Sequence, residues 1–566
     1  MHVKVTTSGS RRYVQLVESF RDEAGRVKKR TVATLGRADQ IKQELDAVIN
    51  GLIKVTGREA SSSDPITAND LHFETARNLG HVWTLTQIWN ELGFSNLRRI
   101  FRRTRHTIDV EALIRIMVLN RLCDPDSKLG VLRWLQTVAL PDIHVQTVTH
   151  QHLLRSMDAL MDHQDAVDDV VSGLLRPLVD SEVTLAFYDM TTIRAEGLCH
   201  VEGDVRQFGM AKEGLIARQF MLGVAQSADG LPLYHEVFDG NTAEAKTLLP
   251  TVRKVMQRFP HLRRLVLVAD RGLLSLDNLE ELRKLTLSDK QELEFILAVP
   301  GRRYSEFVEL LQPLQSVLST SDSERCAEAP WNDLRLVVAH NPITAQEQQH
   351  KRRSSIEELQ AQANAWVGKL DAQDQGSKKR GRKLSDSGAK ARFYHEVRES
   401  HLGNIIKVNM QDDLFSYTIN ENALKLAELM DGKLLVVTNV KDLEPQAVIE
   451  RYKSLADIER GFKVLKSELE IGPVYHRLPE RIRAHASICF MALILHRVMR
   501  MRLKSGDSGL SPERALQLLR RIQHHRVSIR GAEPVSGVSS VDKEAAVVLK
   551  DLRVKQPSQN QQLSLL

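Results

Sequence analysis

Val183-Thr-Leu-Ala-Phe-Tyr-Asp189 is the stretch of sequence that decides the fold. It is a short apolar run rich in β-forming residues, and it ends in a carboxylate. A second run of the same kind, Leu265-Val-Leu-Val-Ala-Asp270, also ends in an aspartate and precedes Arg271-Gly272. Alone, either aspartate is better explained as a helix cap or a turn residue. Two such strands together favour a carboxylate site at one edge of a sheet.

The segments around these two runs predict how the strands are connected. They are a hairpin with strands over 217–225 and 233–238 and a turn at Asp229-Gly230, an amphipathic helix that opens at Asn241, and, after Asp270, a helix over 276–285 and a strand over 295–299. This β-β-β-α-β order describes a ribonuclease H-like core, in which the first and fourth strands are neighbours. Asp189 and Asp270 are 270 − 189 = 81 residues apart, yet we expect them to project together.

A third acid is expected from the stretch Arg451 to Lys466. As one helix, this stretch places an aromatic ring, a carboxylate and ammonium groups on one face, from Tyr452, Glu459, Phe462, Lys463 and Lys466. Taken alone, the stretch is typical of a solvated helix with charge pairs. Beside the two strand-end aspartates, Glu459 becomes a candidate third ligand.

Three carboxylates with open positions suit hard divalent cations such as Mg²⁺ or Mn²⁺. Two such ions about 3.5–4 Å apart clamp the attacking and leaving oxygens of a phosphodiester displacement. The acids Asp189, Asp270 and Glu459 therefore predict phosphoryl transfer on nucleic acid.

These residues resemble a family, the bacterial insertion-sequence DDE transposases with a Tyr-x2-Arg-x3-Glu-x6-Lys signature. Tyr452, Glu459 and Lys466 match the signature at its spacing, while Leu455 stands at the arginine position. Phe187-Tyr-Asp-Met-Thr-Thr192 and Val268-Ala-Asp-Arg-Gly-Leu-Leu-Ser275 resemble the family's first and second acid motifs.

The resemblance implies DNA cleavage at the ends of an insertion sequence and strand transfer into target DNA by a cut-and-paste route. Asp189 would bridge two Mg²⁺ or Mn²⁺ ions, Asp270 would hold one ion and Glu459 the other. Tyr452, Lys463 and Lys466 would contact DNA phosphates near the metals. Two alternatives stay open: an inactive or domesticated DNA-binding protein, which Leu455 allows although the presence of all three acids argues against it, and a ribonuclease H-like nuclease that cuts without joining.

Composition agrees with a protein that acts on nucleic acid. The 566 residues include 79 lysines and arginines against 72 acidic residues, a net charge of +7. Four scattered cysteines indicate neither a disulfide framework nor a zinc ribbon, and together with the lack of a signal peptide they fit a reducing cytoplasm. The longest apolar run, Ile488 to Leu495, is too short to cross a bilayer, so we expect a buried helix and no membrane.

Two basic segments precede the core. Residues 13–36 predict a basic β-hairpin, which contacts DNA or a second subunit, or is a solvated edge kept from aggregating by its charges. An arginine cluster lies next to the predicted helix over 109–122, and it is either a phosphate-binding face for the element's end DNA or a plain solvated face; its members are Arg98, Arg99, Arg102, Arg103 and Arg105.

A long insertion separates the second acid from the third. Strand-like runs and the resemblance predict that it is mostly β. Its run of five basic residues over 378–383 is either a flexible solvated loop or an arm along a DNA backbone. In this family an aromatic residue of the insertion stacks on a displaced base, and Phe415 and Tyr417 are candidates, although aromatic residues on strands are more often core.

The expected fold class is an α/β ribonuclease H-like core with a mostly-β insertion and helical N- and C-terminal regions. The expected domains are a basic hairpin (1–40), a helical DNA-binding region (41–180), the first part of the core (181–300), the insertion (301–445), the second part of the core (446–505) and a helical C-terminal region with a disordered tail (506–566). The expected partners are double-stranded DNA, as transposon ends and target, and a second copy of the chain, because two ends must be cut.

Overall fold

The computed structural model divides into two compact units, Met1–Glu74 with Val527–Val535, and Thr75–Arg526 with Ser536–Leu566. The structure describes all residues except 24–25, 39, 42–46, 48, 50, 52, 57–66, 103–107, 144, 180–183, 198–201, 211–213, 215, 271–275, 287–291, 320–322, 376–383 and 559–566. The basic run at 378–383 therefore lies outside the described residues.

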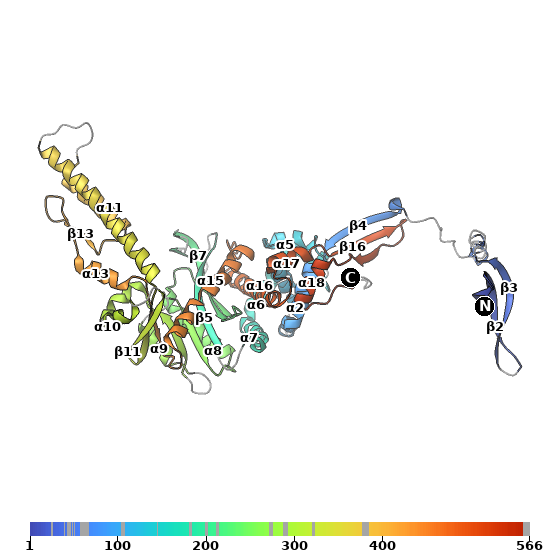
Figure 1. Ribbon diagram of the computed structural model, residues 1–566. Coiled ribbons are helices and arrows are strands. Elements are labelled where there is room, and N and C mark those ends of the chain that lie inside the picture. Colours follow the sequence, from blue (N-terminus) through green and yellow to red (C-terminus); the bar gives the residue numbers. More distant parts are fainter. Residues whose placement is uncertain are drawn as a thin grey trace. The chain divides into compact units, whose positions relative to one another are not determined.

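The first unit contains an antiparallel sheet of three strands, β1 (His2–Ser8), β2 (Arg11–Arg21) and β3 (Val27–Arg37) (Figure 1). The sequence predicts the hairpin β2–β3 but not β1, which pairs along β2. Only Val14 and Val17 of this sheet are fully buried, and an exposed ion pair joins Arg30 to Glu18 at 2.8 Å. The sheet thus presents basic, solvated faces.

A nine-stranded mixed sheet forms the centre of the second unit. Its order is β11-β12-β15-β10-β9-β5-β7-β6, with β8 also on β7. The strands are β5 (Thr184–Arg194), β6 (Gln207–Met210), β7 (Ile216–Ser227), β8 (Pro232–Asp239), β9 (Leu265–Ala269), β10 (Glu294–Ala298), β11 (Arg325–Trp331), β12 (Leu334–His340) and β15 (Lys433–Thr438). As predicted, the first core strand and the fourth, β5 and β9, are parallel neighbours.

Strand β5 does not end at Asp189, as the sequence analysis expects. It continues to Arg194 and pairs with β7 from Ala186 to Arg194. The physical reason is that Met190-Thr-Thr-Ile193 carries β-branched residues and lies opposite the long strand β7, so the hydrogen-bond ladder runs on beyond the acid. Asp189 therefore lies within a strand, whereas Asp270 directly follows β9.

The insertion is mostly helical, so the prediction of a mostly-β insertion is wrong. Its helices are α10 (Val308–Leu318), α11 (Pro342–Asp374), α12 (Asp386–Glu399) and α13 (Glu421–Met430), and its only separate sheet among the described residues is the pair β13 (Ile406–Val408) and β14 (Tyr417–Ile419). The strand-like runs over 334–339 and 434–438 instead extend the core sheet as β12 and β15. Buried apolar strands form wherever a sheet offers an edge, and the sequence does not specify which sheet.

Further helices of the second unit pack on the sheet and on one another (Figure 1). They are α2 (Gly80–Leu92), α3 (Leu97–Phe101), α4 (Val110–Cys123), α5 (Lys128–Leu135), α6 (His150–Asp162), α7 (Gln164–Leu175), α8 (Leu248–Arg258), α9 (Leu276–Arg283), α14 (Pro445–Lys453), α15 (Ala456–Lys463), α16 (Pro479–Ser505), α17 (Pro512–Leu519) and α18 (Lys543–Asp551). The C-terminal region is not only helical, because β16 (Gln523–Ile529) and β17 (Val535–Val538) form a sheet with β4 (Leu71–Asn78).

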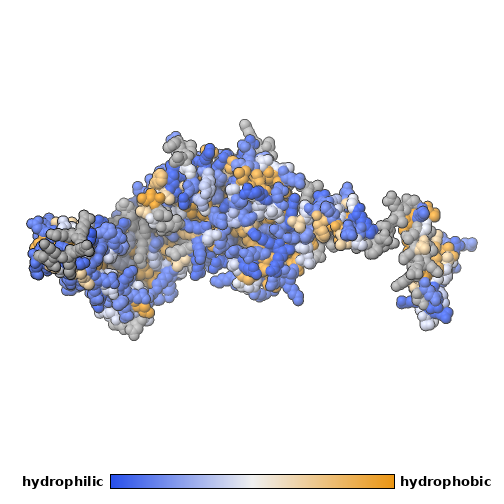
Figure 2. All heavy atoms as spheres, turned by 90° about the horizontal axis from the view of Figure 1, so that it is seen from above, coloured by the Kyte–Doolittle hydropathy of each residue, from blue (hydrophilic) through white to orange (hydrophobic). Residues whose placement is uncertain are grey.

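Helix α16 is the core helix of this unit. It packs against α4, α6 and β8, and every residue from Ile488 to Leu495 is buried, as predicted. Within the described part of the chain it is the one helix long and apolar enough to cross a membrane, but 94 % of its apolar window is covered by other elements. The outer surface seen in Figure 2 is mostly hydrophilic, with hydrophobic residues in scattered groups.

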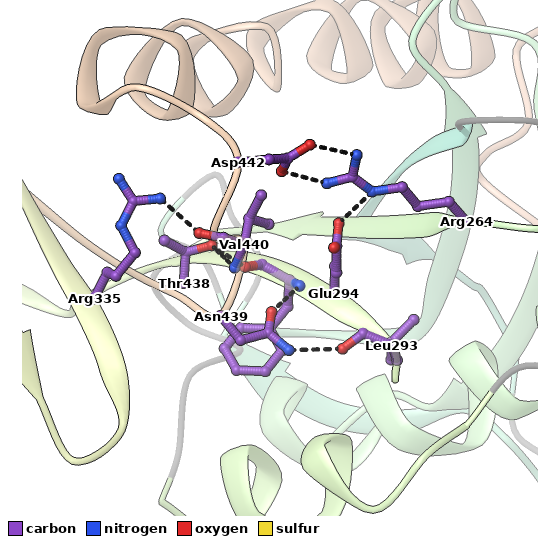
Figure 3. Close-up of polar contacts among 9 residues, drawn as sticks. Arg264, Leu293, Glu294, Arg335, Thr438, Asn439, Val440 and Asp442 are labelled. Atoms are coloured by element: carbon purple, nitrogen blue, oxygen red, sulfur yellow. Dashed lines mark hydrogen bonds and ion pairs between the residues drawn. The ribbon is translucent and has the colours of Figure 1, made fainter. Parts of the chain in front are cut away.

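A polar network ties the end of the insertion back to the core sheet (Figure 3). Arg264 donates to both carboxylate oxygens of Asp442, at 2.6 and 2.7 Å, and to Glu294 at 2.7 Å. The side chain of Asn439 accepts from the amide of Phe295 at 2.8 Å and donates to the carbonyl of Leu293 at 2.9 Å. The network fixes the segment that leads from β15 into α14.

Arg335 completes this attachment from the insertion side. Its guanidinium donates to the carbonyl of Val440 at 2.6 Å (Figure 3). It also donates to the carbonyl of Leu443 at 2.8 Å, and both residues lie between β15 and α14. Bidentate arginine contacts of this kind fix direction as well as distance. The start of α14 is therefore held by strands on both sides of β15.

Replacing Asn439 by alanine should lower the free energy of unfolding by about 1–3 kcal/mol, because the partly buried amide of Phe295 and carbonyl of Leu293 both lose their partner. Urea unfolding followed by circular dichroism measures the change. Asn439→Asp keeps an acceptor for Phe295 and should lose less than Asn439→Ala. Equal stability of Asn439→Ala and the unmodified chain would contradict the role of this side chain.

Candidate active site

Asp189 lies on the face of the sheet that is opposite to α8. Its neighbour Tyr188 is buried, and the hydroxyl of Tyr188 donates to Oγ1 of Thr247, directly before α8, at 2.9 Å. Side chains alternate along a strand, so Asp189 points to the other face. Oδ1 of Asp189 lies 2.6 Å from the amide of Met190, and the residue is half-buried.

Asp270 lies beside Asp189 at the carboxyl end of β9. The parallel register pairs Tyr188 with Ala269, and one further step along both strands brings Asp189 level with Asp270. Asp270 is exposed. The two aspartates are therefore brought together by strand pairing, as the sequence predicts.

The second aspartate is held by a residue from a distant segment. The hydroxyl of Tyr452, on α14, donates to Oδ1 of Asp270 at 2.8 Å. Helix α14 packs across β9, β10, β11 and β12, which carries Tyr452 to the end of β9. Tyr452, which is predicted to contact DNA phosphate, thus donates a hydrogen bond to a carboxylate in this structure.

The stretch from Arg451 to Lys466 is not one helix, contrary to the prediction. Helix α14 ends at Lys453, and α15 begins at Ala456 after a turn in which the amide of Leu455 donates to the carbonyl of Tyr452. The hydroxyl of Ser454 donates to the carbonyl of Glu450 at 3.0 Å, a local bond that competes with helix continuation. Tyr452 and Glu459 are consequently on different helices.

Helix α15 covers the face toward which Asp189 points. Gln226 on β7 is the register partner of Phe187, so Gln226, Phe187 and Asp189 share one face. A Cβ at Gly461 of α15 would lie 2.5 Å from Nε2 of Gln226. Helix α15 therefore lies close to β7 at this point, and it also contacts β5.

Glu459 is on this helix, two residues before Gly461. Its backbone therefore runs over the face that bears Asp189, while its side chain is outside the described residues. The structure brings together two of the three predicted acids and places the helix of the third on their side of the sheet.

The lysines of this stretch follow Glu459 on the same segment. Lys463 is the last residue of α15 and is exposed, and Lys466 is half-buried in a π-helix that runs over Val464–Glu468. Phe462 is 6 % exposed and belongs to the hydrophobic core. It therefore does not lie on the same solvated face as Lys463, which the prediction of one continuous helix had placed beside it. Leu455 packs partly buried against the same core.

The donor set fits a hard divalent cation. Two carboxylates at neighbouring register positions offer oxygen ligands, the type that Mg²⁺ and Mn²⁺ prefer. Among the side chains that the structure describes, no group of three histidines, cysteines or acids forms a metal site, and Glu459 is not among these side chains.

The arginine cluster divides into residues with different surroundings. Nε of Arg98 donates at 2.6 Å to Glu111, which is buried and also accepts from the indole of Trp89 at 2.8 Å. Arg98 thus neutralises a buried carboxylate between α3 and α4. Arg99 and Arg102 are exposed, and Arg103 and Arg105 lie outside the described residues.

The aromatic candidates of the insertion belong to a separate hydrophobic core. Phe415 is 8 % exposed and packs edge-on against Phe393, with ring centroids 5.4 Å apart, and Tyr417 lies 5.0 Å from the same ring. Trp366 on α11 completes this cluster. Phe415 therefore supports the insertion from inside, as aromatic residues on strands usually do.

Sequence reasoning missed the bond between Tyr452 and Asp270 and the close approach at Gly461. The close approach at Gly461 has one local signal, a glycine inside a helix directly before a buried phenylalanine. The bond between Tyr452 and Asp270 has no local signal, because these residues are 182 positions apart in the sequence.

Two family models match the chain. Residues 2–64 match the model described as IS1634 family transposase, N-terminal domain, and residues 185–495 match the model described as Transposase DDE domain. No curated protein matches the chain. A DDE domain has a ribonuclease H-like fold, which confirms that part of the predicted fold class. Since the second match covers more than half of the 566 residues, the chain belongs to the insertion-sequence DDE transposases, enzymes of DNA transposition that cleave DNA and transfer strands.

Proposed function

We propose that Asp189, Asp270 and Glu459 are the three acids of this transposase and that they hold two Mg²⁺ or Mn²⁺ ions. The observation that carries the proposal is the parallel register of β5 and β9, which brings Asp189 level with Asp270 on the side covered by α15. DDE transposases generally use divalent metal ions. When bound, such ions stabilise the attacking and leaving oxygens of a phosphodiester displacement.

The protein's own groups prepare this site in two ways. Tyr452 orients Asp270 through the bond of 2.8 Å, so that one carboxylate oxygen is fixed before any ligand arrives. Lys463 and Lys466, four and seven residues after Glu459, offer ammonium groups to the phosphates on either side of the cleaved bond. Because Tyr452 is bonded to Asp270, its ring also lies near enough to contact the DNA strand that is cleaved.

The cleavage that we propose occurs at the two ends of an insertion sequence, and the freed 3′-hydroxyl then attacks target DNA in a cut-and-paste reaction. Because two ends are cut, we propose that two copies of the chain act together on double-stranded DNA. The exposed Arg99 and Arg102 are candidates for contact with the end DNA. We place the reaction in the bacterial cytoplasm, without a membrane.

Replacing Asp189, Asp270 or Glu459 singly by the corresponding amide should lower end cleavage by at least about 10²-fold, because each change removes one charged ligand. Binding to end DNA should persist. Cleavage in Mg²⁺ is measured on linear DNA that carries the element's own ends. Asp239→Asn, at the exposed end of β8 in the same sheet, is the matched control and should cut normally.

The same DNA separates the three kinds of protein considered. A transposase joins the cut ends to a target plasmid, a nuclease cuts without joining, and an inactive copy binds without cutting. Full cleavage by Asp189→Asn would show that Asp189 is not one of the catalytic acids.

Replacing Tyr452 by phenylalanine should lower the cleavage rate by about 10-fold and raise the Mg²⁺ concentration needed for half-maximal rate, because Asp270 loses the partner that orients it. Rates are measured across a Mg²⁺ titration. DNA binding in EDTA should be unchanged, as it should for the control Tyr394→Phe, an exposed tyrosine on α12. Weaker DNA binding with an unchanged Mg²⁺ dependence would instead mean that Tyr452 acts on DNA alone.

A further inference from the structure

A cavity of about 610 Å³ lies within the second unit, away from the three acids. It is lined by the loop between α4 and α5, by α6, by the segment over 470–477 and by the start of α16. Its basic lining residues are Arg121, Lys128, Arg477 and Arg481, and Asp126 and Glu470 are its carboxylates. Basic groups therefore outnumber acidic ones in the wall.

Lys128 is the unusual member of this wall. It is 6 % exposed, and among the described residues its ammonium group has no hydrogen-bond or ion-pair partner. Burial, together with the nearby charge of Arg121, lowers the pKa of Lys128 to about 7. Burial of most of the side chain disfavours its charged form, and proteins normally pair such a charge or remove it. A group that offers negative charge within the cavity would offset this cost.

The neighbours of Lys128 do not supply that charge. Arg121 donates to the carbonyls of Leu469 and Glu470, which orients its guanidinium beside the cavity. Burial lowers the pKa of His476 to about 3, so this imidazole is neutral. Asp126 accepts from the amide of Ser127 at 2.6 Å and pairs with Arg133, and Arg481 pairs with Asp158.

The mouth of the cavity carries two groups suited to a nucleotide. Tyr475 is 71 % exposed, and Arg477 is exposed two residues later. Aromatic rings stack on bases, and guanidinium groups pair with phosphate oxygens. An exposed ring beside a basic cavity is therefore typical of contact with a nucleic-acid strand.

We propose that this cavity binds a phosphate group of a DNA strand, with Lys128 inside it and Arg477 at its mouth. The proposal rests on the transposase function and adds a DNA contact outside the three acids.

The position of the cavity relative to the acids supports a DNA strand as the source of the phosphate. Val474, in its wall, pairs with the far end of β5, where its amide donates to the carbonyl of Arg194 at 3.0 Å. Arg194 is five residues beyond Asp189 on this strand, a distance of about 17 Å. That distance corresponds to roughly five nucleotide steps along one strand of a duplex.

Thermal unfolding of the full chain in EDTA tests the cavity with inorganic phosphate as the probe. Phosphate should raise the unfolding temperature saturably, compared with chloride at equal ionic strength. Lys128→Met should remove this rise and, in chloride, should itself raise the unfolding temperature, because an unpaired buried charge is gone. An unchanged phosphate effect, or a lower unfolding temperature of Lys128→Met in chloride, would overturn the proposal.

A second measurement identifies the source of the phosphate. Binding of a mixed-sequence duplex in EDTA should weaken for both Lys128→Met and Arg477→Gln, and the slope of log affinity against log salt should fall by about 1 for each. Lys543→Met, which removes an exposed lysine on α18, is the matched control for a general loss of charge and should keep most of the affinity. Unchanged DNA affinity with a lost phosphate effect would overturn the assignment to DNA and leave a site for free phosphate. Because no metal is present, failure here is distinct from failure of the three acids in the cleavage assay.

Discussion

Strands β5 and β9 pair in parallel, and the candidate active site depends on this pairing. The register from Thr184–Leu265 to Tyr188–Ala269 determines which residues come level at the carboxyl end of β9. A slip by one residue would move every side chain of β5 to the other face of the sheet. Tyr188 would then leave its partner Thr247, and Asp189 would point toward α8. The buried bond on one face therefore helps to keep the carboxylate on the other face.

Helix α15, which carries Glu459, follows the long insertion, and specific contacts fix the path of the chain from the insertion back to the core. The insertion contributes β11, β12 and β15 to the core sheet, and Arg264, Asn439 and Arg335 attach the segment after β15 to neighbouring strands. Helix α14 then lies on β9 to β12, and Tyr452 meets Asp270. The turn at Ser454 and Leu455 allows α15 to take its own course over β5, where Gly461 permits close contact with Gln226. Each of these steps is a contact between residues far apart in sequence.

This explains what could be predicted from the sequence and what could not. The apolar runs that end in Asp189 and Asp270 can be recognised locally as strands. The order of the elements between them is enough to predict that the two strands are neighbours in the sheet. The break in the helix after Lys453 has only a weak signal, since serine and leucine both occur within helices. The sequence pattern of β12 and β15 is the same whether these strands form a separate domain or extend the core sheet. An apolar pattern indicates that a strand is buried, but not which strand it pairs with. The burial of Phe415 and the bond between Arg98 and Glu111 likewise follow from packing, so no local pattern in the sequence predicts them.

The extension of β5 beyond Asp189 has a consequence for how charge is distributed over the core. One strand carries a carboxylate at its middle and, at its far end, pairs with the wall of a cavity in which basic groups are in excess. Carboxylates require cations to approach a phosphodiester, whereas the cavity attracts phosphate directly. Without a cation the carboxylates would repel a polyanion such as DNA, whereas the basic cavity that we propose as a phosphate site would attract it. The proposed phosphate contact would thus supply affinity that does not depend on metal, and β5 would set the spacing between the two bound phosphates.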